Sequence, residues 1–348
     1  MKKYLILSLV LICGFSMKVE AGNPDRQGEA GAYELLINPW ARSTGLHGMV
    51  TANVKGVESL RTNVAGLAYT KSTELVFSRS IYLSGTDVNL NAFGFSQRLG
   101  EKGVIGISLM SVDFGEIDIT TTDQPEGIGA TYKPSFFNIG VAYAHQFSER
   151  ISGGFTVRLV SERVTSVSAT GVAFDAGMQY NTGNFQLGIS LRNVGTPLTF
   201  RGDGLTFVGF SPPTENDPVT GSQPFTNALR ANRYELPSLL NIGIAYDFKF
   251  ADDLQRITLV ANFTSNSFSK DQYGGGLEYA LKEQFMLRLG YQYEDGLLDD
   301  AERTNVYTGL AAGATVEVPM KKGGDSTIGI DYSYRASDPF SGTHSFGI

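Results

Sequence analysis

Few side chains in this sequence have a type and spacing that could support catalysis. The three histidines, His47, His145 and His344, are far apart, and none belongs to an HExxH or paired-histidine motif. The sequence also contains no GxSxG motif that would present a serine nucleophile. A serine–histidine–asparagine site of the kind found in membrane phospholipases is the weaker alternative. We therefore predict that the protein is not an enzyme and has no catalytic residue.

Residues that could hold a metal ion or a cofactor are equally sparse. Asp299, Asp300 and Glu302 could bind calcium through their carboxylate oxygens. A charged and solvated loop explains these three residues more simply. We predict neither a metal site nor a bound cofactor.

The first residues have the features of a secretory signal peptide. Lys2 and Lys3 precede a short apolar stretch at 4–15, and Ala21 ends a small-residue cleavage site. We predict that residues 1–21 are a signal peptide cleaved near Ala21. A lipoprotein signal that uses Cys13 is the alternative, but Ile12 stands where a small residue is expected. Cleavage near Ala21 would remove the only cysteine, so disulfides and thiolate metal sites are excluded.

The composition agrees with an exported β protein. Charged residues make up 18% of the chain, below the ordinary value of about 25% for soluble domains, and there are 41 glycines. The net charge falls from −7 to −9 on cleavage, because the leader carries three lysines and one glutamate. That acidity argues against a nucleic-acid partner. Beyond the leader, no stretch reaches the 18 or so apolar residues of a membrane-spanning helix.

Residues 135–160 show a pattern that recurs along most of the chain. Phe137, Ile139, Val141 and Tyr143 are large and apolar, and the residues between them are small or polar. A polar turn follows, and the alternation then resumes. Because successive side chains of a strand point to opposite faces, one face is apolar and the other polar. A soluble sandwich could give the same alternation, so the connections between strands must decide.

The connections indicate a membrane barrel. About fourteen candidate strands can be counted, an even number as in bacterial single-chain barrels. They span residues 74–83, 87–98, 103–112, 135–147, 151–160, 172–181, 185–194, 239–250, 256–266, 273–280, 284–293, 306–318, 327–334 and 343–348. Connections after even-numbered strands are short, and several after odd-numbered strands are long, namely 113–134, 161–171, 195–238 and 294–305. Short periplasmic turns and long outer loops are typical of the bacterial outer membrane. The sequence therefore predicts an all-β fold, a transmembrane antiparallel β-barrel at residues 73–348.

Residues 22–72 differ from the rest of the chain. Val57, Leu60, Val64 and Leu67 recur at helical spacing, which predicts a short amphipathic helix. We interpret this segment as a plug inside the barrel or a cap beneath it on the periplasmic side. A helix packed wherever it finds cover is the alternative.

Two groups of residues are candidates for function. Six charged side chains fall on the polar face of the predicted strands: Arg158, Arg192, Asp247, Glu278, Arg288 and Asp331. They could line a permeation path, but pairing with one another and with a plug is the simpler interpretation. The second group lies in loop 195–238, where residues 198–201 and 205–208 could form a hairpin. Large apolar groups there are candidates for binding a partner, although they could also pack on neighbouring loops: Leu205, Phe207, Val208, Phe210 and Phe225.

Short motifs in the chain resemble the PorV/PorQ family, whose members are relatives of FadL-type barrels. They are PWARSTGL at 39–46, NVAGL at 63–67 and ELPS at 235–238. The chain departs from the family pattern at Val64, where proline is usual, and at 46–48, where LHG replaces Met-Gly-Gly. The resemblance covers nearly the whole chain after the leader.

This resemblance implies a role in the type IX protein secretion system. Such barrels associate with a large outer-membrane translocon barrel and accept secreted cargo through its C-terminal domain. The resemblance also implies that Arg42, Asn63 and Gly66 form a structural motif, with Arg42 and Asn63 holding the N-terminal segment near the periplasmic mouth. It implies no catalytic residue.

Two functions remain open at this point. A protein-docking barrel predicts a filled lumen and an apolar patch on the outer loops. A FadL-like transporter of hydrophobic small molecules predicts an apolar pocket inside the barrel. Because positions facing the lumen are polar or glycine, while residues 198–210 are rich in large apolar groups, the sequence favours the docking barrel.

Overall fold

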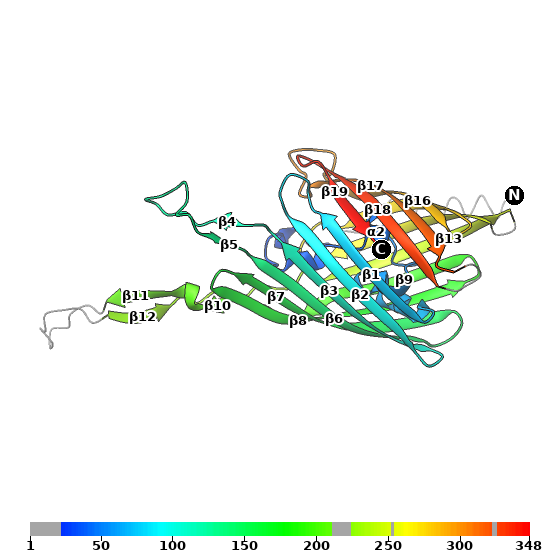
Figure 1. Cartoon of the computed structure of the whole chain (residues 1–348), viewed down its shortest axis with the longest axis horizontal. Helices are drawn as coiled ribbons and strands as arrows, with labels where there is room; N and C mark the ends of the chain where they lie inside the picture. The colour runs from blue at the N-terminus through cyan, green and yellow to red at the C-terminus, as the bar shows by residue number, and fades with distance from the viewer. Residues whose placement is uncertain (1–21, 211–223, 252–253, 322–325) are drawn as a thin grey trace, which may run out of the picture.

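The computed structural model describes residues 22–210, 224–251, 254–321 and 326–348. The predicted signal peptide, residues 1–21, lies outside the described residues. The described chain forms a closed antiparallel β-barrel with a few short helices inside it (Figure 1).

The barrel wall contains fourteen strands, each hydrogen-bonded to the next along the chain. Strand β1 also pairs with β19, and this pairing closes the sheet. The strands are β1 (Thr73–Ile81), β2 (Asn89–Leu99), β3 (Gly103–Asp113), β6 (Ser135–Gln146), β7 (Ile151–Val164), β8 (Val167–Thr182), β9 (Phe185–Gly195), β13 (Leu239–Phe250), β14 (Gln255–Asn266), β15 (Gln272–Leu281), β16 (Phe285–Glu294), β17 (Tyr307–Pro319), β18 (Thr327–Ser337) and β19 (Thr343–Gly347). The predicted fold class is confirmed, because each predicted strand corresponds to one strand of the wall.

The alternation of side chains sorts the two faces of this wall. On β6, Val141 and Tyr143 are exposed while Ala142 and Ala144 are buried. Val141 lies in register with the outward-facing Val157 of β7. An apolar outer surface and a polar or small-residue inner surface are the arrangement that a barrel needs in lipid.

The long loops leave the barrel at one end and the short turns at the other. Two strand pairs belong to the loops: β4 (Ile117–Asp118) with β5 (Thr131–Tyr132), and β11 (Thr206–Phe210) with β12 (Pro224–Ala228). Both pairs project from the same end (Figure 1). By the usual orientation of such barrels, this is the extracellular end and the short turns form the periplasmic end.

Two predictions about the loops are wrong. Residues 161–171 do not form a long loop, because β7 and β8 continue to a tight turn at Thr165-Ser166. Above the membrane a strand needs no apolar outer face, so its sequence lacks the alternation that would reveal it. The predicted hairpin of 198–201 with 205–208 is also wrong. The two-residue strand β10 (Arg201–Gly202) pairs with β8, and β11 pairs with β12 from further along the chain.

The N-terminal segment runs through the barrel from the extracellular to the periplasmic end. The Asn23 N–H donates to the Asn266 carbonyl (3.2 Å) at the extracellular end, and the Arg98 guanidinium donates to the Ala68 carbonyl (3.0 Å) near the periplasmic end. Residues 30–70 of this segment are termed the plug. The segment contains η1 (Pro24–Arg26), η2 (Tyr33–Leu36), α2 (Ala41–Thr44), η3 (Gly56–Arg61) and η4 (Val64–Tyr69). Within the described residues, no helix has the length and apolar character needed to cross a membrane.

The single amphipathic helix predicted around Val57 and Leu67 is wrong in detail. Two 3-10 helices, η3 and η4, stand in its place, and they are separated at Thr62 and Asn63. The Asn63 side chain accepts a hydrogen bond from the Ala65 N–H (3.2 Å), so it caps η4 and prevents one continuous helix.

Candidate binding cavity

The plug fills the periplasmic half of the barrel lumen. Trp40, Val57, Leu60 and Leu67 are all at least 99% buried and pack in one cluster with small wall residues such as Ala142. This burial provides the plug with an apolar core of its own inside an otherwise polar lumen.

Glycines on the inner wall let the plug approach the strands closely. A Cβ atom added at Gly188 of β9 would lie 2.1 Å from the Thr51 carbonyl oxygen of the plug, and one at Gly177 of β8 would lie 2.0 Å from the Asn63 Oδ1 atom. Such distances are far below van der Waals contact, so only glycine fits at these two positions. Other inner-wall glycines approach the plug within about 3 Å of a would-be Cβ: Gly94, Gly106, Gly154, Gly243, Gly274, Gly276, Gly290 and Gly313.

Charged side chains on the inner wall connect the plug to the barrel. Arg158 pairs with Asp175 (2.7 Å) and also donates to the Leu60 carbonyl of the plug (2.9 Å). Arg42 of the plug pairs with Glu317 and Asp331, each at 3.1 Å, close to the periplasmic turns. These contacts fix the orientation of the plug as well as its position.

The structure places all six predicted lumen charges on the inner wall. Besides Arg158 and Asp331, Arg288 pairs with Glu278 (2.6 Å). Asp247 accepts a hydrogen bond from Gln186 (2.8 Å), and Arg192 donates to the Leu35 carbonyl of the plug (3.2 Å). Of the residues implied as a structural motif, Arg42 contacts the wall as described above. The other two lie in or beside η4, where Asn63 donates to the Met178 carbonyl (3.1 Å) and Gly66 packs under the Val54 carbonyl.

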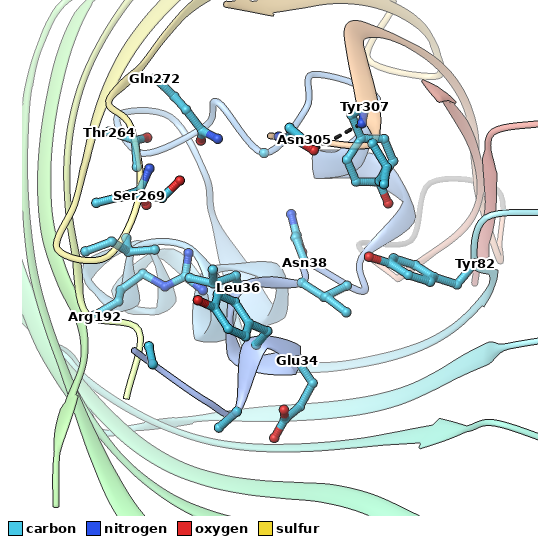
Figure 2. Close-up of a pocket in the computed structure, with 18 of the residues that line it drawn as sticks. Glu34, Leu36, Asn38, Tyr82, Arg192, Thr264, Ser269, Gln272, Asn305 and Tyr307 are labelled. Carbon is cyan, nitrogen blue, oxygen red and sulfur yellow. Dashed lines mark hydrogen bonds between the residues drawn. The ribbon is translucent and has the colours of Figure 1, made fainter. Parts of the chain in front are cut away.

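The extracellular half of the lumen holds an open cavity of about 900 Å³. Its floor is the first part of the plug, which contributes Glu34, Leu36 and Asn38 (Figure 2). The wall strands and the extracellular connections form its sides. The volume lies within the range of about 300–1,000 Å³ for pockets that bind small molecules.

One side of the cavity is apolar. Phe114 and Phe136 line it with their rings 4.8 Å apart in an edge-to-face arrangement. Ile37 of the plug, Val88 and Tyr82 join them around the buried residues Leu90, Met110 and Val112. This group of eight residues is termed the apolar wall. All of them except Leu90 and Met110, which lie behind the others, line the cavity where an apolar molecule could contact them.

The opposite side is polar, and its hydrogen bonds are largely made among the lining residues. Glu294 accepts hydrogen bonds from Gln272 (2.8 Å) and Thr304 (2.7 Å), and Thr264 donates to Asn241 (2.7 Å). Figure 2 shows Thr264, Ser269 and Gln272 on this side, across the cavity from Tyr82. The cavity therefore has two chemically distinct faces.

Several ionisable groups at the edge of the cavity have shifted pKa values, among them Glu34 and Tyr234. Burial raises the pKa of the Glu34 carboxyl, and the neighbouring Glu162 carboxylate adds to the shift. Burial also raises the pKa of Tyr234, which donates a hydrogen bond to Glu162. Tyr234 therefore keeps its proton at neutral pH, and its hydroxyl donates a hydrogen bond at one side of the cavity.

Most of the residues that line this cavity are not among those predicted from the sequence. Tyr82, Phe136 and Arg335 are examples, although Arg335 falls on the same inward face of β18 as Asp331 and Ser333. Simple alternation along β18 could have placed Arg335 inside the barrel. It could not have shown a cavity there, because the position of the plug is not visible in a strand pattern.

The predicted partner-binding residues lie outside the cavity, on the projecting loop. Phe207, Val208 and Phe225 are all about half exposed, at 49%, 61% and 46%. Leu205 lies in the short helix η5 (Asp203–Leu205) below β11. Phe210 belongs to β11, and its side chain lies outside the described residues.

The described residues contain no group of three or more His, Cys, Asp or Glu side chains arranged to hold a metal ion. His47 lies buried in the plug, whereas His145 hydrogen-bonds Tyr143 (3.2 Å) and His344 hydrogen-bonds Tyr332 (2.8 Å) on the outer wall.

Comparisons with known proteins bear on the fold. No protein-family profile matches the sequence, and no curated protein matches it. Solved structures do match, among them the toluene transporter TodX of Pseudomonas putida, with a TM-score of 0.57 at 12% identity over 89% of this chain and 96% of TodX. The CymD monoaromatic hydrocarbon channel matches with a TM-score of 0.55 at 13% identity, over 90% of this chain and 97% of CymD.

The chain has the fold of FadL-like outer-membrane barrels. At 12–13% identity these matches show the fold alone. The barrel fold agrees with the predicted location in the outer membrane, whereas the PorV/PorQ resemblance and the type IX role remain predictions.

Proposed function

We propose that this protein is an outer-membrane channel that admits a small hydrophobic molecule from the extracellular side. The observation that supports this best is the cavity with its apolar wall in the extracellular half of the lumen. Two similar folds, TodX and CymD, are named as a toluene transporter and a monoaromatic hydrocarbon channel. The sequence favoured the docking barrel instead. The inner strand positions alone did not show that the plug and the extracellular connections also contribute residues to a cavity.

Photolabelling of the barrel in lipid nanodiscs with a small apolar aryl diazirine would test this proposal. Phe136 faces the cavity and its neighbour Phe137 faces outward, so they form a matched pair on one strand. We expect excess ethylbenzene to suppress labelling near Phe136 and to leave labelling near Phe137 unchanged. The substitution Val112→Gln places an amide in the apolar wall, which disfavours binding of an apolar probe. It should therefore weaken the labelling near Phe136. Labelling near Phe136 that ethylbenzene does not suppress would contradict the proposal.

A second candidate function rests on the β11–β12 hairpin. Phe207 and Phe225 occupy one face of this hairpin and Val208 the other, and all three are exposed. Large apolar groups on both faces of a projecting hairpin favour a protein partner. This is the docking role in type IX secretion, with a translocon barrel or the C-terminal domain of secreted cargo as the partner.

Purification from outer membranes in mild detergent, followed by mass spectrometry, would test the docking role. We expect a large translocon barrel or cargo to co-purify with the natural protein. A variant with Phe207→Gln and Val208→Gln should lose the partner, whereas Val112→Gln, which alters only the cavity, should retain it. A protein that purifies without such a partner would contradict the docking role and leave the channel proposal intact.

A further inference from the structure

Arg79 of β1 is a charged residue on the outer face of the barrel wall. Among the wall strands, all of whose residues the structure describes, Asp, Glu, Lys and Arg occupy outward positions only at Arg79, Asp113 and Arg163. Asp113 is the last residue of β3, and Arg163 lies near the extracellular end of β7. Arg79 instead stands between two exposed apolar residues of its own outward row, Phe77 and Ile81. The Arg79 charge therefore belongs to the lipid-facing surface.

Arg79 lies at the level where this outer face changes from apolar to polar. Phe77 of β1 and Phe93 of β2 are register partners, and both are large and apolar. Two residues nearer the extracellular end, Arg79 is opposite Asn91, which is in turn opposite Ser111 of β3. A charge on the lipid face of a barrel is costly at the bilayer midplane and costs little near the interface. This position therefore places the guanidinium beside the headgroups of the outer leaflet.

The Arg79 side chain has no partner within the described residues. No hydrogen bond, ion pair or ring contact joins it to another described group. Its register partners on the two neighbouring strands, Asn91 and Phe346, carry no charge. The outward carboxylate of Asp113 lies two strands away and accepts a hydrogen bond from the Gly115 N–H (3.1 Å). An anionic group of the surrounding lipid is therefore the partner that Arg79 can reach.

The side chains around Arg79 suit a phosphate group and the lipid that carries it. A guanidinium holds a phosphate with two parallel N–H···O bonds, and the Asn91 amide directly opposite can donate one more. On the other side, Phe346 and Tyr332 are exposed, and their ring centres are 5.3 Å apart. Aromatic side chains of this kind are typical of the membrane boundary of a barrel. Toward the bilayer centre, Phe77 offers an apolar surface to acyl chains.

We propose that Arg79 and Asn91 bind a phosphate group of a lipid in the outer leaflet. The acyl chains of this lipid lie along Phe77, and its headgroup lies against the ring of Phe346. Lipid A, the phosphorylated saccharolipid of bacterial outer membranes, has the chemistry that this site requires. The bound lipid crosses β1 and β19, the pair of strands that closes the barrel. This inference concerns the outer wall and is independent of the proposed channel function.

Native mass spectrometry of the full barrel in a neutral detergent would test the inference with three probes. They are diphosphoryl lipid A, the same lipid after enzymatic removal of both phosphates, and inorganic phosphate. We expect diphosphoryl lipid A to bind at least tenfold more tightly than its dephosphorylated form, because only the phosphate pairs with Arg79. Inorganic phosphate at the same concentration should not displace the lipid, because it lacks acyl chains.

Variants at Arg79 make the test specific. Arg79→Gln should bring the affinity for diphosphoryl lipid A down to that of the dephosphorylated form. Arg79→Lys should keep part of the preference, because an ammonium group retains the charge but loses the paired N–H groups. Since Arg79 is exposed and has no protein partner, we expect both variants to fold, and the gel mobility of unheated samples would verify a closed barrel. The matched control is Arg163→Gln, which makes the same change on the outward face of β7, four strands away, and should leave the preference intact.

Several outcomes would overturn the inference. Equal affinity for the two forms of lipid A would show that the phosphate is not recognised. A preference that survives Arg79→Gln would show that another group holds the phosphate. If Arg163→Gln lowers the affinity as much as Arg79→Gln does, the general surface charge rather than a site at β1 attracts the lipid. Displacement by inorganic phosphate would show a site for free phosphate instead of a lipid.

Discussion

The periplasmic half of the barrel lumen is tightly packed, whereas the extracellular half is open. In the periplasmic half, plug backbone lies directly against glycines of the wall, and buried arginines such as Arg158 are paired with acids. In the extracellular half, the same plug forms only the floor, and long side chains surround an open space of about 900 Å³. One segment of about forty residues therefore both closes the barrel and forms the floor of the cavity.

The two parts of the plug therefore differ in how tightly they are packed. Residues 40–70 are held by close packing, which leaves little freedom to move because protein interiors are tightly packed. Residues 30–38, except the fully buried Leu35, line the open cavity, so a ligand could reach them without displacing the packed part. Weakening the packed half and altering the open half should consequently have different effects, and the following predictions use that difference.

The largest effect is expected where the plug backbone meets the wall. Gly188→Val places methyl groups where the Thr51 carbonyl oxygen already lies 2.1 Å from a would-be Cβ, so the plug or the strand must move. We expect the free energy of unfolding to fall by about 3 kcal/mol or more. We also expect ions to pass through the disturbed plug. Urea unfolding and single-channel recording in planar bilayers would measure the two effects.

The matched control is Gly275→Val on β15. Gly275 faces outward, and the nearest atom to its would-be Cβ is the Val260 carbonyl oxygen at 3.3 Å. This variant should keep a closed lumen. If both glycine variants conduct ions equally, the close approach of plug and wall is not what seals the periplasmic half.

A narrower effect, on stability alone, is expected from the ion pair that holds the plug to β7 and β8. Asp175 accepts hydrogen bonds from Arg158 (2.7 Å) and from the Asn193 N–H (2.7 Å), and all of these groups are buried. Asp175→Ala leaves the Arg158 charge buried without its partner, which costs about 3–5 kcal/mol. Urea unfolding in lipid vesicles would measure this loss.

The control for that variant is Asp300→Ala in an outer loop. Asp300 lies 3.4 Å from Arg303, but its side chain is 91% exposed, so its removal should leave stability unchanged within error. Equal losses of stability for the two aspartate variants would contradict the view that burial makes the Arg158–Asp175 ion pair important for stability.

The sequence predicted the wall far better than the lumen, for a physical reason. In lipid, every strand must show an apolar outer face, so Phe137, Val141 and their counterparts mark each strand in the sequence. The plug obeys no such rule, and its two 3-10 helices are separated at Asn63, whose capping hydrogen bond is formed only in the folded chain. The cavity needed both the wall and the plug to be placed in space, so Arg335 and Phe136 could not be recognised as neighbours of one site.

The smallest predicted effect concerns the segment that covers the extracellular side of the plug. Tyr234 donates a hydrogen bond to Glu162, its backbone pairs with Leu198, and Gly31 of the plug packs directly under its ring. Tyr234→Phe keeps the ring and removes the donor, which leaves a buried carboxylate with one hydrogen bond fewer. We expect a local loss of about 1 kcal/mol, equal to roughly fivefold faster hydrogen exchange.

Hydrogen exchange followed by mass spectrometry can locate this effect. Exchange should accelerate at residues 28–36 and 228–238, where the Gly31 N–H donates to the Glu235 carbonyl (3.0 Å). It should stay unchanged at 56–69, because that part of the plug is held by the glycines and ion pairs of the periplasmic half. Tyr246→Phe, on the outward face of β13, is the control and should change neither region. Faster exchange along the whole plug would show that its two halves open together, and the division between a packed closure and an independent cavity floor would then be wrong.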